Sequence, residues 1–435
     1  MSTKNKFDIT QVVKENLCHS CGACFASCGH DSIDFKETIG GYNIPIIDYD
    51  SCTNCGLCFD VCSGDHFGKT LTNNIPENHF VGNIISTHVG KATDKRIFDN
   101  SQSGGITTSI LANLLNSNEI EVALVAIMKE GIPPRGDFAL VNSSQELYAC
   151  QKSKYTPISL LSAIPLLKKV KGKIAIVGLS CHFHSLQNLC DTYSWLAKKD
   201  ILKIGLICDR VMTTTAIDFI SLQATNNPVN NFIFRDKLKP SYPGNSVVFS
   251  NDSEFVLDAS IRMNMKDFFT PARCRLCFDK LNIFSDLVMG DPHGIADIDK
   301  KHGETLVFTR TIKGKEILEN SNKANVINIR TVNTQVAING QKIEKKIIDF
   351  NKFTAAWSSL NRKLPNYPFE IESVNSFLDE RIKLEHSLNL DKFNSREELL
   401  SYAQKYYKKL KYKSLKDLIF KKIKSIIKKI LNKGN

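Results

Sequence analysis

Two copies of one cysteine spacing lie near the start of the chain, 34 positions apart: Cys18-x2-Cys21-x2-Cys24-x3-Cys28 and Cys52-x2-Cys55-x2-Cys58-x3-Cys62. Between them, Gly40 and Gly41 separate two short strand-like segments, residues 32–36 and 42–47, which predicts a hairpin. Cysteine thiolates bind iron–sulfur clusters, and this doubled run is the arrangement of bacterial two-cluster ferredoxins. The start of the chain is therefore predicted to fold as an α+β unit around two [4Fe–4S] clusters.

In that arrangement each cluster takes three cysteines from one run and the last cysteine of the other. We expect one cluster on Cys18, Cys21, Cys24 and Cys62, and a second on Cys52, Cys55, Cys58 and Cys28. The alternatives are zinc and eight unrelated thiols, but zinc needs only paired C-x2-C. The sequence departs from this arrangement in one respect. A proline usually follows the fourth cysteine of each run, but here Gly29 follows Cys28 and Ser63 follows Cys62.

Six further cysteines lie later in the chain. Cys181 follows a predicted strand at 173–179, and Cys208 follows another at 201–207. Both should lie at the carboxyl edge of a parallel sheet, where α/β proteins build their sites. Together with Cys274 and Cys277 they are candidates for a third [4Fe–4S] cluster. On spacing alone, a set of buried thiols plus an unrelated C-x-x-C explains these four cysteines as well as a third cluster does. The two remaining cysteines, Cys150 and Cys190, are expected to be structural.

Short apolar runs joined by helices continue from about residue 85, which predicts an α/β domain with a mostly parallel sheet. The helices are expected at 105–115, 159–170, 182–196 and 213–224, and the strands at 122–128, 173–179 and 201–207. Shorter alternating runs at 246–250 and 254–257 predict an α+β addition. With 435 residues, two to three domains are expected. They are a ferredoxin-type domain at 8–68 and an α/β domain in two parts, 85–170 and 171–340, followed by a tail helix at 400–435.

Charge is concentrated in that tail. The net charge is +12, and residues 401–435 hold twelve Lys and one Asp, so the first 400 residues carry 12 − 11 = +1. The rest of the chain is therefore not basic enough to be a nucleic-acid-binding surface.

Apolar residues from Leu415 to Leu431 follow helical spacing, with Lys on the opposite face, which favours reversible contact with an anionic membrane. The alternative is docking on protein. No signal-peptide core or spanning run occurs, so a cytoplasmic location is expected, with the tail on the inner face of the membrane.

Several segments in the middle of the chain resemble one known family, the β subunits of coenzyme F420 hydrogenases and dehydrogenases and their bacterial relatives. They are Ser101-Gln-Ser-Gly-Gly-Ile106, Ser153-Lys-Tyr155, Val177-Gly-Leu-Ser-Cys181, Ile204-Gly-Leu-Ile-Cys208, Phe234-Arg-Asp-Lys237, Cys274-Arg-Leu-Cys277 and Asp286-Leu-Val-Met-Gly-Asp-Pro-His-Gly-Ile295. The resemblance implies a flavin-binding α/β domain, electron transfer between FAD and clusters, and a third cluster on Cys181, Cys208, Cys274 and Cys277. The last segment resembles a bacterial branch often associated with surface-polysaccharide genes. Leu179 and Ser180 replace the threonine and proline usual before Cys181, and use of the deazaflavin coenzyme is left open.

The resemblance also gives a candidate flavin site. Ser103, Gly104 and Gly105 open a predicted helix, where free N–H groups and the helix dipole favour a phosphate. Lys154 and Arg235 are candidates to balance phosphate or flavin charge. The alternatives are an ordinary glycine-rich helix start and solvated cations.

The predicted function is an iron–sulfur flavoprotein oxidoreductase. It passes electrons between [4Fe–4S] clusters and a flavin that acts on an unidentified small molecule, with a redox protein such as a ferredoxin as partner. One alternative is a deazaflavin (coenzyme F420) hydrogenase or dehydrogenase β subunit. The other is a non-catalytic subunit that transfers electrons to a partner enzyme.

Overall fold

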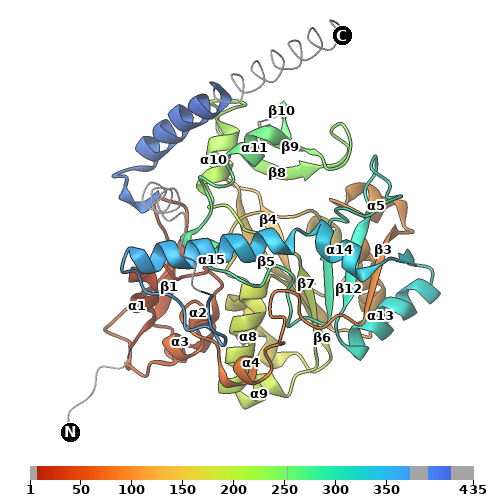
Figure 1. Ribbon diagram of the computed structural model, residues 1–435, viewed down its shortest axis with the longest axis horizontal. Helices are drawn as coiled ribbons and strands as arrows, with labels where there is room; N and C mark the ends of the chain where they lie inside the picture. The colour runs from red at the N-terminus through yellow and green to blue at the C-terminus, as the bar shows by residue number, and fades with distance from the viewer. Residues whose placement is uncertain (1–6, 252, 373–389, 413–435) are drawn as a thin grey trace, which may run out of the picture.

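The computed structural model describes residues 7–251, 253–372 and 390–412 (Figure 1). Its N-terminal unit contains α1 (Ile9–Lys14), α2 (Ala23–Ser27), β1 (Ile33–Glu37), β2 (Asn43–Ile47), α3 (Leu57–Asp60) and α4 (Lys69–Asn73). The predicted hairpin is confirmed, because β1 and β2 pair antiparallel with Ile33 opposite Ile47. The backbone turns at Gly41 with φ +84°, and a Cβ there would lie 2.6 Å from the Thr215 nitrogen. Only glycine therefore lets the hairpin tip dock on the rest of the molecule.

A mixed eight-stranded sheet forms the centre of the molecule, in the order β13-β3-β12-β11-β7-β6-β4-β5. The four strands β11, β7, β6 and β4 run parallel, and the outer strands pair antiparallel. The strands are β3 (Ser86–Ala92), β4 (Val122–Lys129), β5 (Arg135–Val141), β6 (Ile174–Gly178), β7 (Ile201–Leu206), β11 (Leu287–Gly290), β12 (Thr305–Thr309) and β13 (Ile327–Thr331). The predicted parallel core is thus confirmed, with β6 and β7 adjacent.

Two apolar clusters on this sheet hold the surrounding helices. One cluster joins α6 and α13 to sheet residues such as Ala123 and Leu287. The other joins α8, α9 and the 3-10 helix to Leu124 and Ile176. These helices, with the short ones beside them, are α5 (Lys95–Asn100), α6 (Ile106–Asn116), α7 (Ser144–Ala149), the 3-10 helix (Leu160–Lys169), α8 (Ser180–Thr192), α9 (Ser194–Ala197), α13 (Ile312–Lys323) and α14 (Thr334–Gly340). The segment expected as an α-helix at 159–170 is 3-10, and Pro165 within it supplies no backbone N–H.

The predicted α+β addition is a three-stranded antiparallel sheet with helices packed against it. It contains β8 (Asn231–Asp236), β9 (Asn245–Ser250), β10 (Ser253–Leu257), α10 (Thr215–Ser221) and α11 (Ala259–Met265). A helix over 396–412, preceded by the 3-10 turn Leu390–Lys392, packs beside α10 and α11 (Figure 1). Leu399, Ala403 and Tyr407 of that helix are buried against Phe219 and Phe268. The predicted tail helix from Leu415 to Leu431 lies outside the described residues.

The long helix α15 (Ile343–Ser359) crosses from the sheet to the ferredoxin-like unit (Figure 1). Its Phe350 packs in the apolar cluster beside the sheet, whereas Phe353 and Trp357 pack against Ile9 and Val12. Short helix α12 (Ala272–Arg275) lies against it. The helix therefore joins the two units by packing into two apolar clusters, one at the sheet and one at the ferredoxin-like unit. No helix among the described residues is long and apolar enough to cross a membrane.

Candidate functional site

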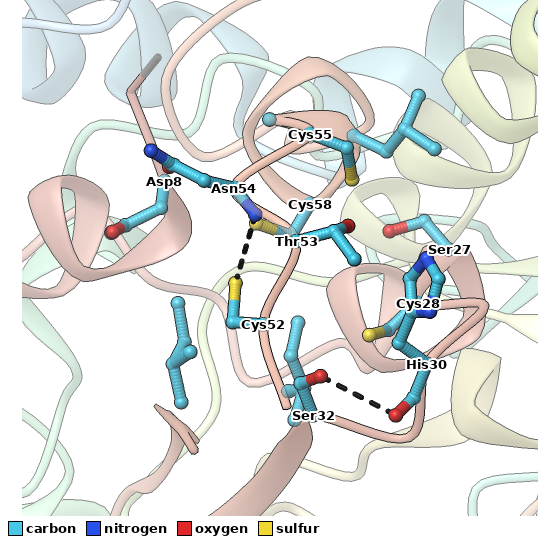
Figure 2. Close-up of a pocket in the computed structure, with 14 residues that line it drawn as sticks. Asp8, Ser27, Cys28, His30, Ser32, Cys52, Thr53, Asn54, Cys55 and Cys58 are labelled. Carbon is cyan, nitrogen blue, oxygen red and sulfur yellow. Dashed lines mark hydrogen bonds between the residues drawn. The ribbon is translucent and has the colours of Figure 1, made fainter. Parts of the chain in front are cut away.

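Four cysteine thiols surround one cavity in the ferredoxin-like unit (Figure 2). They belong to Cys28, Cys52, Cys55 and Cys58, and Asp8, Ser27 and His30 lie beside them. The Sγ atom of Cys52 accepts a hydrogen bond from the backbone N–H of Asn54 at 3.4 Å. Cys55 is exposed, so this outer set opens towards the molecular surface. The structure brings together the four cysteines that we expect to share the second cluster.

The inner set lies deeper, on the side of the ferredoxin-like unit that faces the α/β domain. Burial raises the pKa of the Cys18 thiol to about 12. Burial also raises the pKa of Cys24, and the neighbouring thiols of Cys18, Cys21 and Cys62 raise it further. Cys58 of the outer set contributes as well, so these effects agree with the expected grouping of the inner thiols and also place the outer set close by. Ligation by either set stays a prediction.

The third set converges at the carboxyl edge of the parallel strands. Cys181 lies in the first turn of α8, directly after β6, and Cys208 follows β7. Cys274 lies on α12, with Cys277 just beyond its end. Burial raises the pKa of Cys181 well above its ordinary value, and the thiols of Cys21, Cys208, Cys274 and Cys277 raise it further. The four thiols of the third set therefore lie near one another, and Cys21 of the inner set lies near Cys181.

A buried arginine lies between the inner and third sets. Arg273 donates to the carbonyl oxygens of Gly64 at 3.0 Å, Ser63 at 3.2 Å and Leu276 at 3.0 Å. Its exposed fraction is 2%. No described carboxylate lies within ion-pair distance of it. A buried cation without a carboxylate is costly unless another anion balances it. The two thiol sets beside Arg273 would supply that charge as cluster ligands.

Among the residues that the structure describes, no three His, Cys, Asp or Glu side chains meet closely enough to hold a single metal ion. A [4Fe–4S] cluster does not need such a group, because its four cysteines bind four different irons.

The glycine-rich loop expected to bind flavin is tightly packed against the sheet. Ser103 donates its hydroxyl to the carbonyl oxygen of Glu304, and the Gly104 N–H donates to Thr305 Oγ1 at 2.9 Å. A Cβ at Gly104 would lie 2.4 Å from the Gly90 carbonyl oxygen, so this glycine serves close packing. Gly105, at φ +79°, precedes α6, and α6 begins without a side-chain cap. Gly105 is therefore the one of these three residues that lies next to the first N–H groups of α6, which have no side-chain acceptor.

Two lysines considered for this region, half-buried Lys154 and buried Lys237, make different contacts. Lys154 donates to the carbonyl oxygens of Cys150, Gln151 and Lys152 at 2.6–2.9 Å, which uses all three ammonium hydrogens. Burial lowers the pKa of Lys154 to about 7. Lys237 donates to Ser103 O at 2.7 Å and Ser101 Oγ at 3.2 Å, and burial lowers its pKa to about 8. Lys237 thus contacts the loop directly, whereas Lys154 stabilises its own turn.

Arg235 lies on β8 and faces the carboxyl edge of the central sheet. Its Nη1 donates to Asp291 Oδ2 at 2.8 Å and to Tyr155 Oη at 2.9 Å, and its Nε donates to the Pro243 carbonyl at 2.8 Å. Its Nη2 is buried and has no hydrogen-bond partner. The guanidinium of Arg262, whose Nε is also buried without a partner, lies over the Tyr155 ring. Unpaired buried donors of this kind suit an anionic group.

Family models match most of the chain. Residues 87–165 match the N-terminal model, and 171–335 the C-terminal model, of the coenzyme F420 hydrogenase/dehydrogenase β subunit. This chain belongs to that family. Residues 17–65 also match a 4Fe-4S dicluster domain. The family expected from the sequence motifs and its N-terminal ferredoxin domain are both confirmed.

Similar proteins occur in species of Methanosarcina and Methanothermobacter. An F(420)H(2) dehydrogenase subunit of Methanosarcina mazei is 24% identical over 316 residues, covering 72% of this chain and 84% of that protein. The coenzyme F420 hydrogenase β subunit of Methanothermobacter thermautotrophicus is 24% identical over 249 residues, covering 56% and 83%. A chain of the F420-reducing [NiFe] hydrogenase complex of Methanosarcina barkeri is similar in fold, with TM-score 0.50 and 15% identity over 67% of this chain and 99% of that chain.

Four residues at these sites were not predicted as site residues. Arg273 and Lys237 lie inside or beside quoted motifs, so their positions in those motifs could have drawn attention to them. Ser63 was noted only as a replacement for proline. Ser185 lies in the middle of α8 with its Oγ 3.4 Å from Cys21 Sγ, and nothing in its sequence context indicates this contact.

Proposed function

We propose that this family member is an iron–sulfur flavoprotein oxidoreductase that passes electrons between [4Fe–4S] clusters and a flavin acting on a small-molecule substrate. The observation that carries the proposal is the placement of twelve thiols in three neighbouring sets, with Cys21 of the inner set linked to Cys181 of the third through the hydroxyls of Ser185 and Ser63. Bound clusters supply one-electron steps, and a bound flavin exchanges both one and two electrons. The chain would supply ligands, positions and exclusion of water.

The proposed ligands form an ordered path through the protein. The outer set, which includes exposed Cys55, lies at the surface, where a redox partner such as a ferredoxin can approach. The inner set is buried, and the third set lies at the carboxyl edge of the sheet. Arg273 lies between the last two sets, where its positive charge would offset the charge that clusters add. This arrangement favours passage of electrons from the surface to the α/β domain.

The proposed flavin site lies at the same sheet edge, around Arg235. Its support is the buried, unpaired Nη2 atom of Arg235, together with the uncapped start of α6 after Gly105. Lys237 adds a third positive group against the loop. These donors suit the phosphates of FAD, because they lie in one region and include atoms without partners. Ser103 and Gly104 would hold the loop in place rather than bind the phosphate themselves.

A redox titration of the purified protein tests this proposal. Three clusters and one flavin should take up about five electrons per chain, one for each cluster and two for the flavin. An uptake of about three electrons, with no flavin released by acid, would instead support a non-catalytic electron carrier.

A second candidate function is that of a deazaflavin oxidoreductase subunit, favoured by the names of the relatives. Reduction of the holoprotein by reduced coenzyme F420 would support it. A role in surface-polysaccharide metabolism and a cytoplasmic location stay predictions, the first resting on the segment from Gly290 to Ile295.

A further inference from the structure

Ser63 is the contact point between the inner and third thiol sets. It directly follows Cys62, and its exposed fraction is 0%. Its N–H donates to Ser185 Oγ at 3.3 Å, and its Oγ lies 2.7 Å from the same atom. Its Oγ also lies 3.4 Å from the carbonyl oxygen of Cys181, to which it can donate. Ser63 thereby joins the ferredoxin-like unit to the first turn of α8.

Ser185 extends this contact to a sulfur atom. In the thiol form, Cys21 Sγ donates to Ser185 Oγ at 3.4 Å. A ligating cysteine has lost that proton and can only accept a hydrogen bond. The single hydroxyl hydrogen of Ser185 must then be the donor. This is possible because the N–H and O–H of Ser63 can both donate to Ser185 Oγ, which leaves the Ser185 hydrogen free to face sulfur.

The residue type at position 63 matters for this arrangement. Bacterial two-cluster ferredoxins usually have proline after the fourth cysteine. Proline has neither a backbone N–H nor a hydroxyl, so it could make neither contact with Ser185. The carbonyl oxygen of Ser63 is meanwhile held by Arg273 at 3.2 Å, which fixes the orientation of this peptide. The replacement therefore adds two donors at the point where the two thiol sets meet.

We propose that Ser63 and Ser185 form a positioning pair that keeps a hydrogen bond donated to Cys21 Sγ and so raises the reduction potential of the inner cluster beside the third cluster. The inference rests on the proposed function, because it requires a cluster on Cys18, Cys21, Cys24 and Cys62. Hydrogen bonds to ligand sulfurs stabilise the reduced, more negative state of a cluster and raise its potential. The pair would favour arrival of an electron at the inner cluster from the outer one.

Midpoint potentials measured by redox titration with electron paramagnetic resonance test this proposal in the full-length holoprotein. The Ser185→Ala variant should shift one cluster to a more negative potential and leave the others unchanged. Ser63→Ala, which keeps the N–H, should give a smaller shift of the same cluster. Ser63→Ala should add nothing in the Ser185→Ala background, because Ser63 acts through Ser185. The matched control is Ser321→Ala, since that buried hydroxyl on α13 donates to the Ile317 carbonyl at 2.8 Å and touches none of the three thiol sets.

The outcomes separate this inference from the proposed function. Iron content should equal that of the wild type in each serine variant, and the Cys18→Ser variant identifies the signal of the inner cluster. If Ser185→Ala keeps its iron and leaves that potential unchanged, the inference is wrong while the ligand sets stand. If Cys18→Ser changes no cluster signal, the ligand assignment fails and the inference fails with it. Should Ser63→Ala fail to fold, the Ser185→Ala result still decides.

Discussion

The Nη1 atom of Arg235 lies 2.8 Å from Oδ2 of Asp291 in a partly buried ion pair. Arg235 belongs to β8 of the three-stranded sheet, whereas Asp291 directly follows β11 of the central sheet. The pair therefore fixes the guanidinium across the boundary between the two sheets. Because the contact uses Nη1, the unpaired Nη2 is held in place on the same guanidinium. An anionic ligand would meet a donor whose position is already set.

Replacing Arg235 should therefore weaken flavin binding. We expect Arg235→Gln to raise the dissociation constant for FAD by roughly 10- to 150-fold, because a hydrogen bond to a charged group contributes about 1.5–3 kcal/mol. Fluorescence titration of flavin-stripped protein measures this change. Arg135→Gln is a suitable control, because Arg135 also pairs with a carboxylate, that of Asp218 at 3.0 Å, away from the proposed flavin site. Equal affinity in wild type and Arg235→Gln would contradict the proposed site.

Flavin affinity should also depend on pH through Lys237. Burial lowers the pKa of this ammonium to about 8 in the flavin-free protein. A nearby phosphate favours the charged form, so bound FAD should raise that pKa and binding should take up a proton above pH 8. The dissociation constant should then rise up to about tenfold per pH unit above 8 and be flat below it.

Lys237→Arg should remove this pH dependence, because arginine stays charged throughout the range. The measurement is the same fluorescence titration, repeated between pH 6.5 and 9.5. An unchanged dissociation constant across that range in the wild type would show that Lys237 does not face the phosphate.

The basic tail should bind anionic membranes. Residues 413–435 hold eight Lys and one Asp, and their apolar residues follow helical spacing. Vesicles containing phosphatidylserine should sediment the full chain but not a chain that ends at Tyr412, and salt should weaken binding as the Debye length falls from about 10 Å at 0.1 M to about 3 Å at 1 M. The cut follows Tyr412 because Leu399 and Tyr407 are buried in the body. Equal sedimentation of both chains would instead indicate that the tail docks on protein.

Local patterns in the sequence predicted much of this fold. The period of apolar residues identified β4, β6 and β7 within one or two residues, because buried parallel strands are short apolar runs. The two glycines identified the β1–β2 turn. The third thiol set followed from the rule that parallel strands end at one edge, once the family resemblance supported it. The strands and the hairpin turn could be predicted because they depend on residues close together in the sequence. The third thiol set could be predicted because it depends on a general rule of sheet topology.

Contacts between units could not be predicted in this way. Ser185 meets Ser63 across 122 positions of sequence, and both are small polar residues of ordinary context. Lys154 was a candidate to balance phosphate or flavin charge, and its ammonium donates to carbonyls of its own turn, a contact that the motif did not indicate. Whether a lysine faces a ligand or its own backbone depends on tertiary packing, which residue type and spacing do not specify.

The most direct test of the account is the iron and acid-labile sulfide content of anaerobically purified protein. Three clusters predict about twelve irons per chain, and the Cys274→Ser/Cys277→Ser variant should retain about eight. The matched variant Cys150→Ser/Cys190→Ser, which leaves all three thiol sets intact, should still hold about twelve. A wild-type content of about eight irons, unchanged when Cys274 and Cys277 are replaced, would show that the third thiol set holds no cluster.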